Sequence, residues 1–338
     1  MTLDDRRVLV TGATGFLGRH LVRTLAEETK AGLRLVTRAG TADDLPAAAR
    51  ATSELARADL TDTVLLPELC RGIDTVIHTA ALMPGRQDHG AEAYRRVNLD
   101  AVLQLAHAAA AAGARRFVFV SSTAAMGAPV TDSVDETTPC RPSSPYEVTK
   151  RLAEEGLLEL ATATGLEVVI VRPCLIAGEG QRGGVLLKLF KLCRRGLFPV
   201  FGGRRELQKP LVDVEDVAHA LILAVAKGKP GETFLVTSGV RHTLAEMLAI
   251  AVSLTGNAKP AIDVPLPLAR LAAAVTTPLA WLAGREPPLS PERLELFLAD
   301  RAIDIGKARR ELGYAPHYRD LRSMLARTYA WYGMSGQL

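Results

Sequence analysis

The sequence predicts an α/β protein in which a doubly wound parallel sheet carries a smaller C-terminal substrate-binding lobe. Short apolar runs, typical of buried parallel strands, alternate with stretches of helical periodicity through the first half of the chain. A glycine-rich turn joins the first such strand to the first helix. The chain has 338 residues, 48% of them apolar, which is enough to bury a large core and excludes a disordered protein.

The first strand, Arg7–Thr11, runs directly into three glycines, and helical periodicity follows to about Lys30. Where a strand turns sharply into a helix, free backbone N–H groups and the positive end of the helix dipole meet at one point. Gly12 can make the tight turn, Gly15 lets a pyrophosphate approach the backbone, and Gly18 lets the helix pack close to the strand. We therefore expect a dinucleotide to bind here, in contact with Gly12, Thr14, Gly15, Phe16, Leu17 and Gly18.

The second strand, Leu33–Thr37, should end beside the adenine ribose of that dinucleotide. A carboxylate at this place would bind the ribose 2′-hydroxyl and favour NAD. The chain has Arg38 instead, and a guanidinium can pair with a 2′-phosphate. The predicted cofactor is therefore NADP, with NAD as the alternative if Arg38 is only a solvated loop residue.

The fifth strand, Arg116–Val120, brings two hydroxyl side chains to the edge of the sheet. Ser122 and Thr123 follow it at the carboxyl end, where ligands bind in open α/β folds. Either hydroxyl could hold a substrate oxygen, and the sequence does not decide between them.

The next helix places a tyrosine and a lysine on one face. Ser144 is a good N-cap, and the helix extends to about Thr164 with Tyr146 and Lys150 one turn apart. A phenol titrates near pH ~10 and is a poor acid–base catalyst at neutral pH. A neighbouring ammonium favours the phenolate and lowers that pKa.

The order of these motifs resembles the extended branch of the short-chain dehydrogenase/reductase superfamily. From Thr11 the turn reads T-G-A-T-G-F-L-G, similar to the family's T-G-x-x-G-x-x-G, and Ser-Ser-Thr and Tyr-x-x-x-Lys follow in the family's order. Leu211–Ala218 and Lys307–Pro316 are similar to two further family segments, so the resemblance covers nearly the whole chain. The chain departs from the family after Pro173, because Ile176–Gly180 lacks the usual tyrosine and proline.

The resemblance implies further cofactor contacts on a Rossmann-type sheet. Asp59, followed by Leu60, would hold the adenine amino group. Ala80 and Ala81 would leave room under the nicotinamide half of the cofactor, and Pro173 would border it.

Three polar residues have alternative interpretations. Asp59 could instead cap a helix expected over Asp62–Cys70. In the family, the residue that matches Asn98 organises a water chain to the active-site lysine, but Asn98 could also be a surface residue of a helix expected over Ala91–Ala112. His78 ends the fourth strand and is interpreted as a packed histidine rather than a catalytic base.

We expect residues 1–178 to form the cofactor-binding domain, to which 211–237 return, and 179–210 and 238–338 to form most of the substrate lobe. Within that lobe, residues 265–284 are apolar but interrupted by prolines and an arginine, so they do not form a membrane span. They could form a lid over an apolar substrate, a surface in weak contact with a membrane, or an ordinary buried helix pair.

The composition and two of the expected helices indicate which partners and which cell compartment to expect. The net charge of +4 is small and spread out, with no basic run suited to nucleic acid. Four cysteines without C-x-x-C or zinc-ligand spacing indicate reduced thiols, no metal site and a cytoplasmic protein, and no signal peptide is recognised. The helices at 91–112 and 146–164 resemble the pair that forms the family's dimer interface, so a homodimer is expected.

The motifs together predict an NADP-dependent oxidoreductase that interconverts a ketone and a secondary alcohol on a small, largely hydrophobic molecule. In this function the chain resembles the 3β-hydroxysteroid dehydrogenase-like members of the family. Tyr146 would transfer the proton, and Lys150 would lower the pKa of Tyr146 and bind the nicotinamide ribose. Thr123 or Ser122 would hold the substrate oxygen, and Asn98 would support the lysine.

Two other functions remain open. A nucleotide-sugar epimerase with tightly bound NAD would use the same catalytic residues, and the cations available for its diphosphate are Arg204, Arg205 and Lys209. A sugar dehydratase is disfavoured because Ala124 and Ala125 stand where that enzyme needs Asp-Glu. A non-catalytic NADP-binding sensor is the third function, and the intact Tyr146 and Lys150 argue against it.

Overall fold

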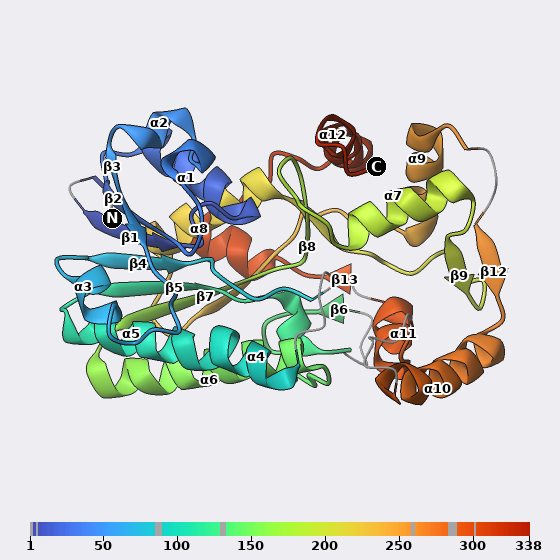
Figure 1. Cartoon of the computed structure of the whole chain (residues 1–338), viewed down its shortest axis with the longest axis horizontal. Helices are drawn as coiled ribbons and strands as arrows, with labels where there is room; N and C mark the ends of the chain where they lie inside the picture. The colour runs from blue at the N-terminus through green and yellow to red at the C-terminus, as the bar shows by residue number, and fades with distance from the viewer. Residues whose placement is uncertain are drawn as a thin grey trace.

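The computed structural model describes residues 3–4, 6–84, 90–128, 133–257, 261–282, 289–300 and 302–338. In this part of the chain a sheet of seven strands, all parallel, runs in the order β11-β7-β5-β4-β1-β2-β3 (Figure 1). The strand order reverses between β1 and β4, which is where open α/β sheets bind ligands. The predicted doubly wound α/β fold is confirmed. The strands are β1 (Arg7–Thr11), β2 (Gly32–Thr37), β3 (Ser53–Arg57), β4 (Thr75–His78), β5 (Arg116–Val120), β7 (Glu167–Pro173) and β11 (Thr233–Val236).

Alternate residues of the central strands face two separate hydrophobic layers. Val8 and Val10 of β1 pack on one side and Leu9 on the other, and all three are fully buried. This follows because successive side chains of a strand point to opposite faces. The helices on the first side are α1 (Phe16–Glu28), α2 (Ala47–Arg50) and α8 (Val214–Lys227), and those on the second are α3 (Leu66–Cys70), α5 (Ala101–Ala111) and α6 (Pro145–Thr164) (Figure 1).

The helix expected over Asp62–Cys70 is shorter than predicted and begins only at Leu66. In the segment where the first helical turn was expected, aspartate side chains accept hydrogen bonds from backbone N–H groups, and the backbone is not helical. The Asp59 carboxylate accepts from the N–H of Thr61, and the Asp62 carboxylate accepts from that of Val64. Aspartate often offers the backbone this alternative to a helix.

The helix expected over Ala91–Ala112 is interrupted by one wider turn. It consists of α4 (Ala91–Arg95), a π-helical segment η2 (Arg96–Asp100), and α5. Such segments are rare and often occur at functional positions. Here the segment contains Asn98.

Most of the remaining elements form a smaller unit, on the right of Figure 1, whereas η4 (Ala308–Leu312) packs in the core beside α8. Helices α7 (Val185–Arg195), α9 (Leu244–Thr255) and α12 (Leu321–Met334) pack around Phe190 and Tyr332, which are fully buried. The short parallel strand pairs are β8 (Leu175–Ala177) with β10 (Leu211–Asp213), β9 (Pro199–Phe201) with β12 (Ile262–Val264), and β6 (Ser133–Val134) with β13 (Ala302–Ile303).

Helix α10 (Leu266–Leu282) corrects part of the prediction for residues 265–284. Pro278 lies inside it, so this proline interrupts the apolar run but not the helix. The helix packs on α11 (Pro291–Leu298), but at positions 266–280, whose burial the structure describes, only the small side chains of Ala269 and Ala273 are fully buried. The interpretation as an ordinary buried helix pair is therefore wrong. Among the described residues no helix is long and apolar enough to cross a membrane.

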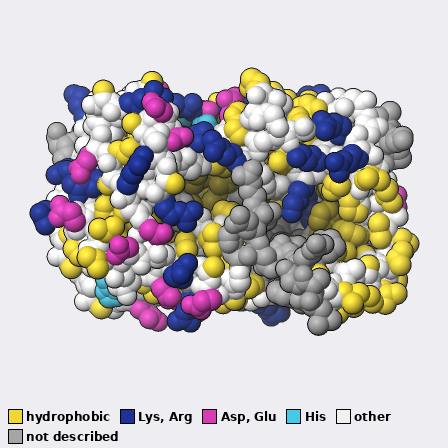
Figure 2. Space-filling model, viewed as in Figure 1, with side chains coloured by type: hydrophobic (Ala, Val, Ile, Leu, Met, Phe, Trp, Pro, Cys, Tyr) yellow, Lys and Arg dark blue, Asp and Glu magenta, His cyan; other side chains and the backbone are white. Residues whose placement is uncertain are grey.

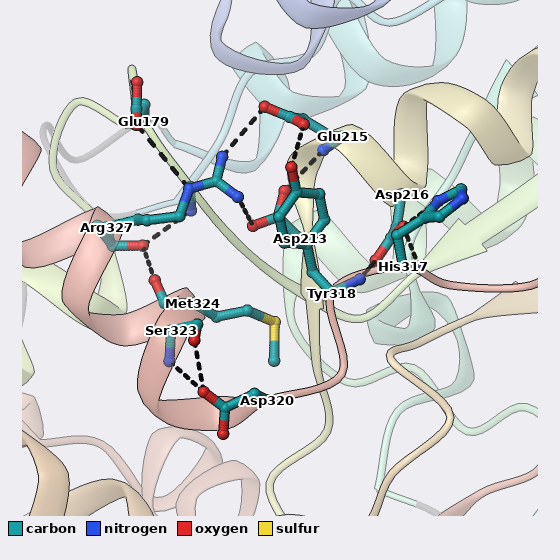
Figure 3. A network of polar contacts seen from close by, with 12 residues as sticks. Glu179, Asp213, Glu215, Asp216, His317, Tyr318, Asp320, Ser323, Met324 and Arg327 are labelled. Atoms are coloured by element: carbon teal, nitrogen blue, oxygen red, sulfur yellow. Dashed lines mark hydrogen bonds and ion pairs between the residues drawn. The ribbon is translucent and has the colours of Figure 1, made fainter.

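A network of ion pairs connects the smaller unit to α1 and α8, two of the helices that pack on the sheet (Figure 3). Arg327 of α12 lies 3.4 Å from Asp213 Oδ2, 3.1 Å from Glu215 Oε1 and 3.8 Å from Glu179 Oε1. Glu215 Oε1 also lies 3.1 Å from Arg23 Nη2 on α1. Asp213 caps α8 by accepting the N–H of Glu215 at 3.0 Å. We call these five residues the Arg327 network.

Candidate functional site

The glycine turn between β1 and α1 has little space for side chains. Gly12 has a φ of +67°, and a Cβ there would lie 2.9 Å from the Ala80 backbone. A Cβ at Gly18 would lie 2.0 Å from the Gly12 carbonyl oxygen. Glycine at these two positions therefore lets α1 and the loop after β4 pack directly against the turn.

The start of α1 leaves backbone donors without a side-chain cap. Its N-cap is Gly15, which is exposed and has no side chain to accept the first N–H groups, and no acidic residue lies in the first turn. Thr14 Oγ1 is turned to Thr37 Oγ1 at 2.8 Å. Phe16 is half-buried, and Leu17 packs into the core. This helix start can therefore receive an anionic group such as a pyrophosphate.

Arg38 and Asp59 lie near each other at the carboxyl ends of β2 and β3. Arg38 is exposed. Asp59 Oδ1 accepts from Thr61 N at 2.9 Å and Thr61 Oγ1 at 2.8 Å, and these hydrogen bonds hold the pKa of the Asp59 carboxyl below its usual value, with a smaller effect from the Arg38 charge. Asp59 thus caps a turn and not the helix that its alternative interpretation expected, because α3 begins only at Leu66. Leu60 after it is half-buried.

His78 is a packed residue, as predicted. Its Nδ1 lies 2.9 Å from Thr11 Oγ1, and its ring stacks on those of Phe117 and Phe119 with centroids 6.1 and 5.9 Å away. Burial, assisted by the charge of Lys150, lowers the pKa of His78 to about 3. The imidazole is therefore neutral at physiological pH.

Asn98 is fully buried, so its interpretation as a surface residue is wrong. Its Oδ1 accepts the N–H of Leu82 at 2.8 Å, and its Nδ2 donates to the Leu82 carbonyl at 2.9 Å. The same loop contains the half-buried Ala80 and Ala81. Asn98 therefore holds in place the loop that follows β4, and this loop packs against the glycine turn.

Tyr146 lies in the first turn of α6, where a capping box fixes the helix start. Ser144 Oγ accepts the N–H of Glu147 at 3.3 Å, and the Glu147 carboxylate accepts the N–H of Ser144 at 3.2 Å. The phenol is buried and donates to Met83 Sδ at 3.6 Å, while its ring meets the edge of Tyr94.

Of the two candidate hydroxyls, Ser122 is the one at the phenol. Burial raises the pKa of Tyr146 to about 12, and a hydrogen bond with the Ser122 side chain opposes that rise. Ser122 also caps η3 (Thr123–Met126), accepting the N–H of Ala124 at 3.1 Å. Thr123 is buried at the start of η3.

Lys150 lies one turn after Tyr146 and is also buried. Its Nζ donates to the Val120 carbonyl at 2.9 Å and lies 4.7 Å from the centre of the Phe119 ring. Burial lowers the pKa of Lys150 to about 8, and the charge of Glu154 opposes that change. Below about pH 8 this side chain therefore supplies a cation beside the end of β5.

Sequence reasoning missed a buried ion pair behind this lysine. Glu154 Oε1 accepts from Arg172 Nε at 2.8 Å and from Ser121 Oγ at 2.5 Å. Arg172 Nη2 lies 2.5 Å from Glu154 Oε2, and both side chains are almost fully buried. A lone arginine in the apolar strand β7, directly before the buried Pro173, was the available signal, because a buried charge requires a partner.

Of the three cations considered for a diphosphate, Arg205 and Lys209 have other partners. Arg205 Nη2 lies 2.7 Å from both carboxylate oxygens of Asp263. Lys209 Nζ donates to the carbonyls of Phe297 and Ala299, at 2.7 and 2.9 Å, at the end of α11. Arg204 is exposed beside the start of α10.

Residues 8–237 match the family described as the NAD dependent epimerase/dehydratase family. The chain is 31% identical to a 3 beta-hydroxysteroid dehydrogenase/Delta 5-->4-isomerase of Mycobacterium tuberculosis, covering 94% of this chain and 88% of that protein. It is 32% identical to a 4-hydroxy-2-methyl-3-oxo-4-farnesyl-3,4-dihydroquinoline-1-oxide ketoreductase of Stigmatella aurantiaca (91% and 92% covered). It is 28% identical to a UDP-glucose 4-epimerase of Vibrio cholerae (79% and 82% covered).

Solved structures are similar over almost the whole chain. The crystal structure of gox2253 superposes with a TM-score of 0.83 at 28% identity, covering 99% of this chain and all of that one. The complex of MoeE5 with UDP-glucose and NAD superposes with a TM-score of 0.75 at 27% identity, covering 97% and 99%. The likeness therefore extends through the smaller unit as well as the sheet.

Proposed function

Because this chain belongs to the NAD dependent epimerase/dehydratase family, within the extended short-chain dehydrogenase/reductases, we propose that it is an NADP-dependent oxidoreductase that interconverts a ketone and a secondary alcohol. Membership of the family makes it an NAD(P)-dependent enzyme. The observation that carries the proposal is the buried Tyr146 phenol, which lies beside Ser122 and one helical turn from Lys150.

The residues around the glycine turn fit a dinucleotide. The uncapped start of α1 would hold the pyrophosphate. The loop that carries Ala80 and Ala81 packs so close to Gly12 that a Cβ there would collide with it. Arg38 would pair with the 2′-phosphate, and Asp59, with Leu60, would face the adenine. Lys150 would hold the nicotinamide ribose, with Pro173 at the border. When bound, the nicotinamide supplies or accepts the hydride at the carbonyl carbon.

Tyr146 would move the proton. In the reducing direction its hydroxyl donates to the substrate oxygen, and Ser122 donates a second hydrogen bond to the same oxygen. This phenol is a weak acid, because burial raises its pKa to about 12 despite the hydrogen bond with Ser122. The Lys150 cation on the same face of α6 stabilises the phenolate that remains after transfer. Asn98 contributes by holding the loop that carries Met83 against the phenol.

A largely hydrophobic substrate is supported by three observations. The steroid dehydrogenase and the farnesylated quinoline ketoreductase among the relatives are named for lipophilic substrates. In the structure, Arg205 and Lys209, two of the three cations considered for a nucleotide diphosphate, are engaged with Asp263 and with the end of α11. Figure 2 also shows hydrophobic side chains in the visible part of the hollow between the sheet and the smaller unit.

Three further assignments belong to the same proposal. Residues 1–178 with 211–237 would bind the cofactor, and 179–210 with 238–338 would mainly bind substrate. Helices α4 to α6 would form a homodimer interface, since α6 leaves Leu152 exposed on its outer surface. The protein would act in the cytoplasm.

The deciding experiment follows nicotinamide absorbance with purified protein, NADPH or NADH, and a panel of hydrophobic ketones. We expect stoichiometric NADPH oxidation with at least one ketone and weaker activity with NADH. Arg38→Asp should shift the preference towards NADH, and an unchanged preference would mean that Arg38 does not contact the 2′-phosphate. Thr41→Asp, farther along the same loop, is the matched control for added charge.

The alternative function is a nucleotide-sugar epimerase with tightly bound NAD, which the likeness to the UDP-glucose 4-epimerase and to MoeE5 favours. In that case the purified protein would retain NAD, and no ketone would cause net nicotinamide oxidation. Conversion of a UDP-hexose would then be measured directly, and its occurrence would replace the ketoreductase assignment.

A further inference from the structure

Helix α10 is inverted relative to an ordinary surface helix. Four of its large apolar side chains point outward: Leu268, Leu271, Val275 and Leu279 are each between 50% and 61% exposed. Leu266 is partly buried, and the fully buried side chains among the described positions 266–280 are the small Ala269 and Ala273. The exposed positions are spaced by three, four and four residues, so they form one stripe along the helix. We call these four residues the outer stripe.

The outer stripe belongs to a larger apolar surface. Ile262 of β12, just before α10, is 46% exposed, and Leu197, just before β9, is 51% exposed. β12 and β9 are paired strands, so these two segments are neighbours. Figure 2 shows hydrophobic side chains gathered over β12 and α10, on the right of the molecule, with Lys and Arg side chains above them over α7.

The charge of this part of the chain is one-sided. Residues 185–205 contain six basic and no acidic side chains, and residues 261–282 contain one of each. Since the whole chain has a net charge of +4, the rest of it is net negative. Lys188, Arg194, Arg195 and Arg204 are exposed. The arginine within α10, Arg270, lies off the outer stripe and is 3.7 Å from Glu295 of α11.

We propose that the outer stripe of α10 and the basic residues of α7 and of the 204–205 loop dock on the surface of an anionic lipid bilayer. An uncharged stripe beside Lys and Arg side chains is the pattern of a helix that lies in the membrane interface without crossing it. The 17 residues of α10 extend over about 25 Å in that plane.

The charge around the outer stripe favours a bilayer over a second copy of the chain as the partner of this surface. A symmetric pair in contact through this surface would bring two strongly basic patches together, whereas anionic headgroups complement them. The docking does not depend on the enzymatic assignment. It would allow a substrate that partitions into lipid to reach the smaller unit without crossing water.

The test is sedimentation of the full-length protein with vesicles of phosphatidylcholine, with and without about 30% phosphatidylglycerol. We expect the partition coefficient to be at least about tenfold higher on the anionic vesicles and to fall several-fold in 0.5 M salt. Leu271→Glu combined with Val275→Glu should lower binding at least about tenfold. Arg194→Gln combined with Arg195→Gln should remove most of the preference for anionic lipid.

The matched control is Val64→Glu, because Val64 is 83% exposed in the turns before α3, far along the chain from the patch. It should bind vesicles like the parent. Equal binding by the stripe variant and the parent, or no binding to anionic vesicles, would overturn the proposal. So would a concentration-dependent dimer, without lipid, that the stripe variant abolishes. Vesicle binding is measured without substrate, so a failed ketone assay does not affect it.

Discussion

Two polar clusters of this molecule are built in opposite ways. In the Arg327 network each charged group faces an opposite charge, and Asp213 and Glu215 also accept hydrogen bonds from Glu215 N and from the Tyr318 hydroxyl (Figure 3). At the Tyr146 site the phenol's hydrogen-bond partners among the described residues are a thioether sulfur and one serine hydroxyl. The network can stabilise the joint between the two units, whereas the phenol can still donate its proton to another molecule.

Tyr146→Phe tests the chemical side of this difference and should have the largest effect. The ring and its contact with Tyr94 are kept, while the proton is lost. We expect turnover to fall by about 10²- to 10⁴-fold, with NADPH affinity unchanged. The free energy of unfolding should change by less than about 1 kcal/mol, because the phenol has only weak partners. Steady-state NADPH oxidation and urea unfolding measure both, and activity within threefold of the parent would reject Tyr146 as the acid.

Arg327→Leu tests whether the Arg327 network stabilises the joint between the two units. Its removal leaves the fully buried Asp213 beside Glu215 without their shared cation. The free energy of unfolding should fall by about 3 kcal/mol, the low end for a buried pair because Arg327 is a quarter exposed. Turnover per folded molecule should be kept. Arg322→Leu, exposed on the same helix, is the control and should change stability by less than about 0.5 kcal/mol.

The Arg327 network should also give a pH-dependent stability. Burial raises the pKa of Asp213 to about 6 from 3.8. A group with a raised folded pKa favours folding most below its unfolded pKa and loses that contribution as the pH rises through the folded value. Asp213 should therefore lower the free energy of unfolding by about 2 to 3 kcal/mol between pH 4 and pH 7.

Asp213→Asn, which keeps an N-cap, should remove this part of the pH profile. The measurement is urea unfolding at several pH values for both proteins. Parallel profiles would show that the Asp213 carboxyl titrates alike in the folded and unfolded chain.

Arg23→Gln should have the smallest effect. Arg23 forms the outer pair of the Arg327 network, and its side chain is 39% exposed. Pairs of this kind contribute about 0 to 1 kcal/mol and weaken with salt. A loss above about 2 kcal/mol in urea unfolding would mean that the joint between α1 and α8 depends on this contact more than its exposure implies.

Features that lie within one continuous segment of the chain could be predicted from the sequence. The glycine turn lies within one strand and one helix, and Tyr146 and Lys150 share one helix, so local spacing was sufficient to bring them together. Six of the seven parallel strands were likewise predicted from short apolar runs, whereas β11 was not. The first, second and fifth strands lie within one residue of their predicted bounds.

Contacts between distant segments could not be predicted in this way. Met83 precedes Tyr146 by 63 residues, and Asp213 precedes Arg327 by 114. No local pattern connects such pairs, and only the burial of a charge indicates that a partner must exist. The outward face of α10 was hidden for another reason: both faces of that helix are apolar, so periodicity could not tell which one is buried.

The wider turn at η2 has a consequence for insertions and deletions. It lets Tyr94 of α4 meet Tyr146 while Val102 and Leu105 of α5 pack under the sheet. A π-helical turn holds about one residue more than an α-helical turn, so deleting one residue from Arg96–Asp100 would give regular α-helical hydrogen bonds and leave α4 and α5 in nearly the same relative orientation. The contact of Tyr94 with Tyr146 would then be kept, whereas a second deletion would rotate α4 by about 100° and break it. This segment should therefore tolerate the loss of one residue but not of two.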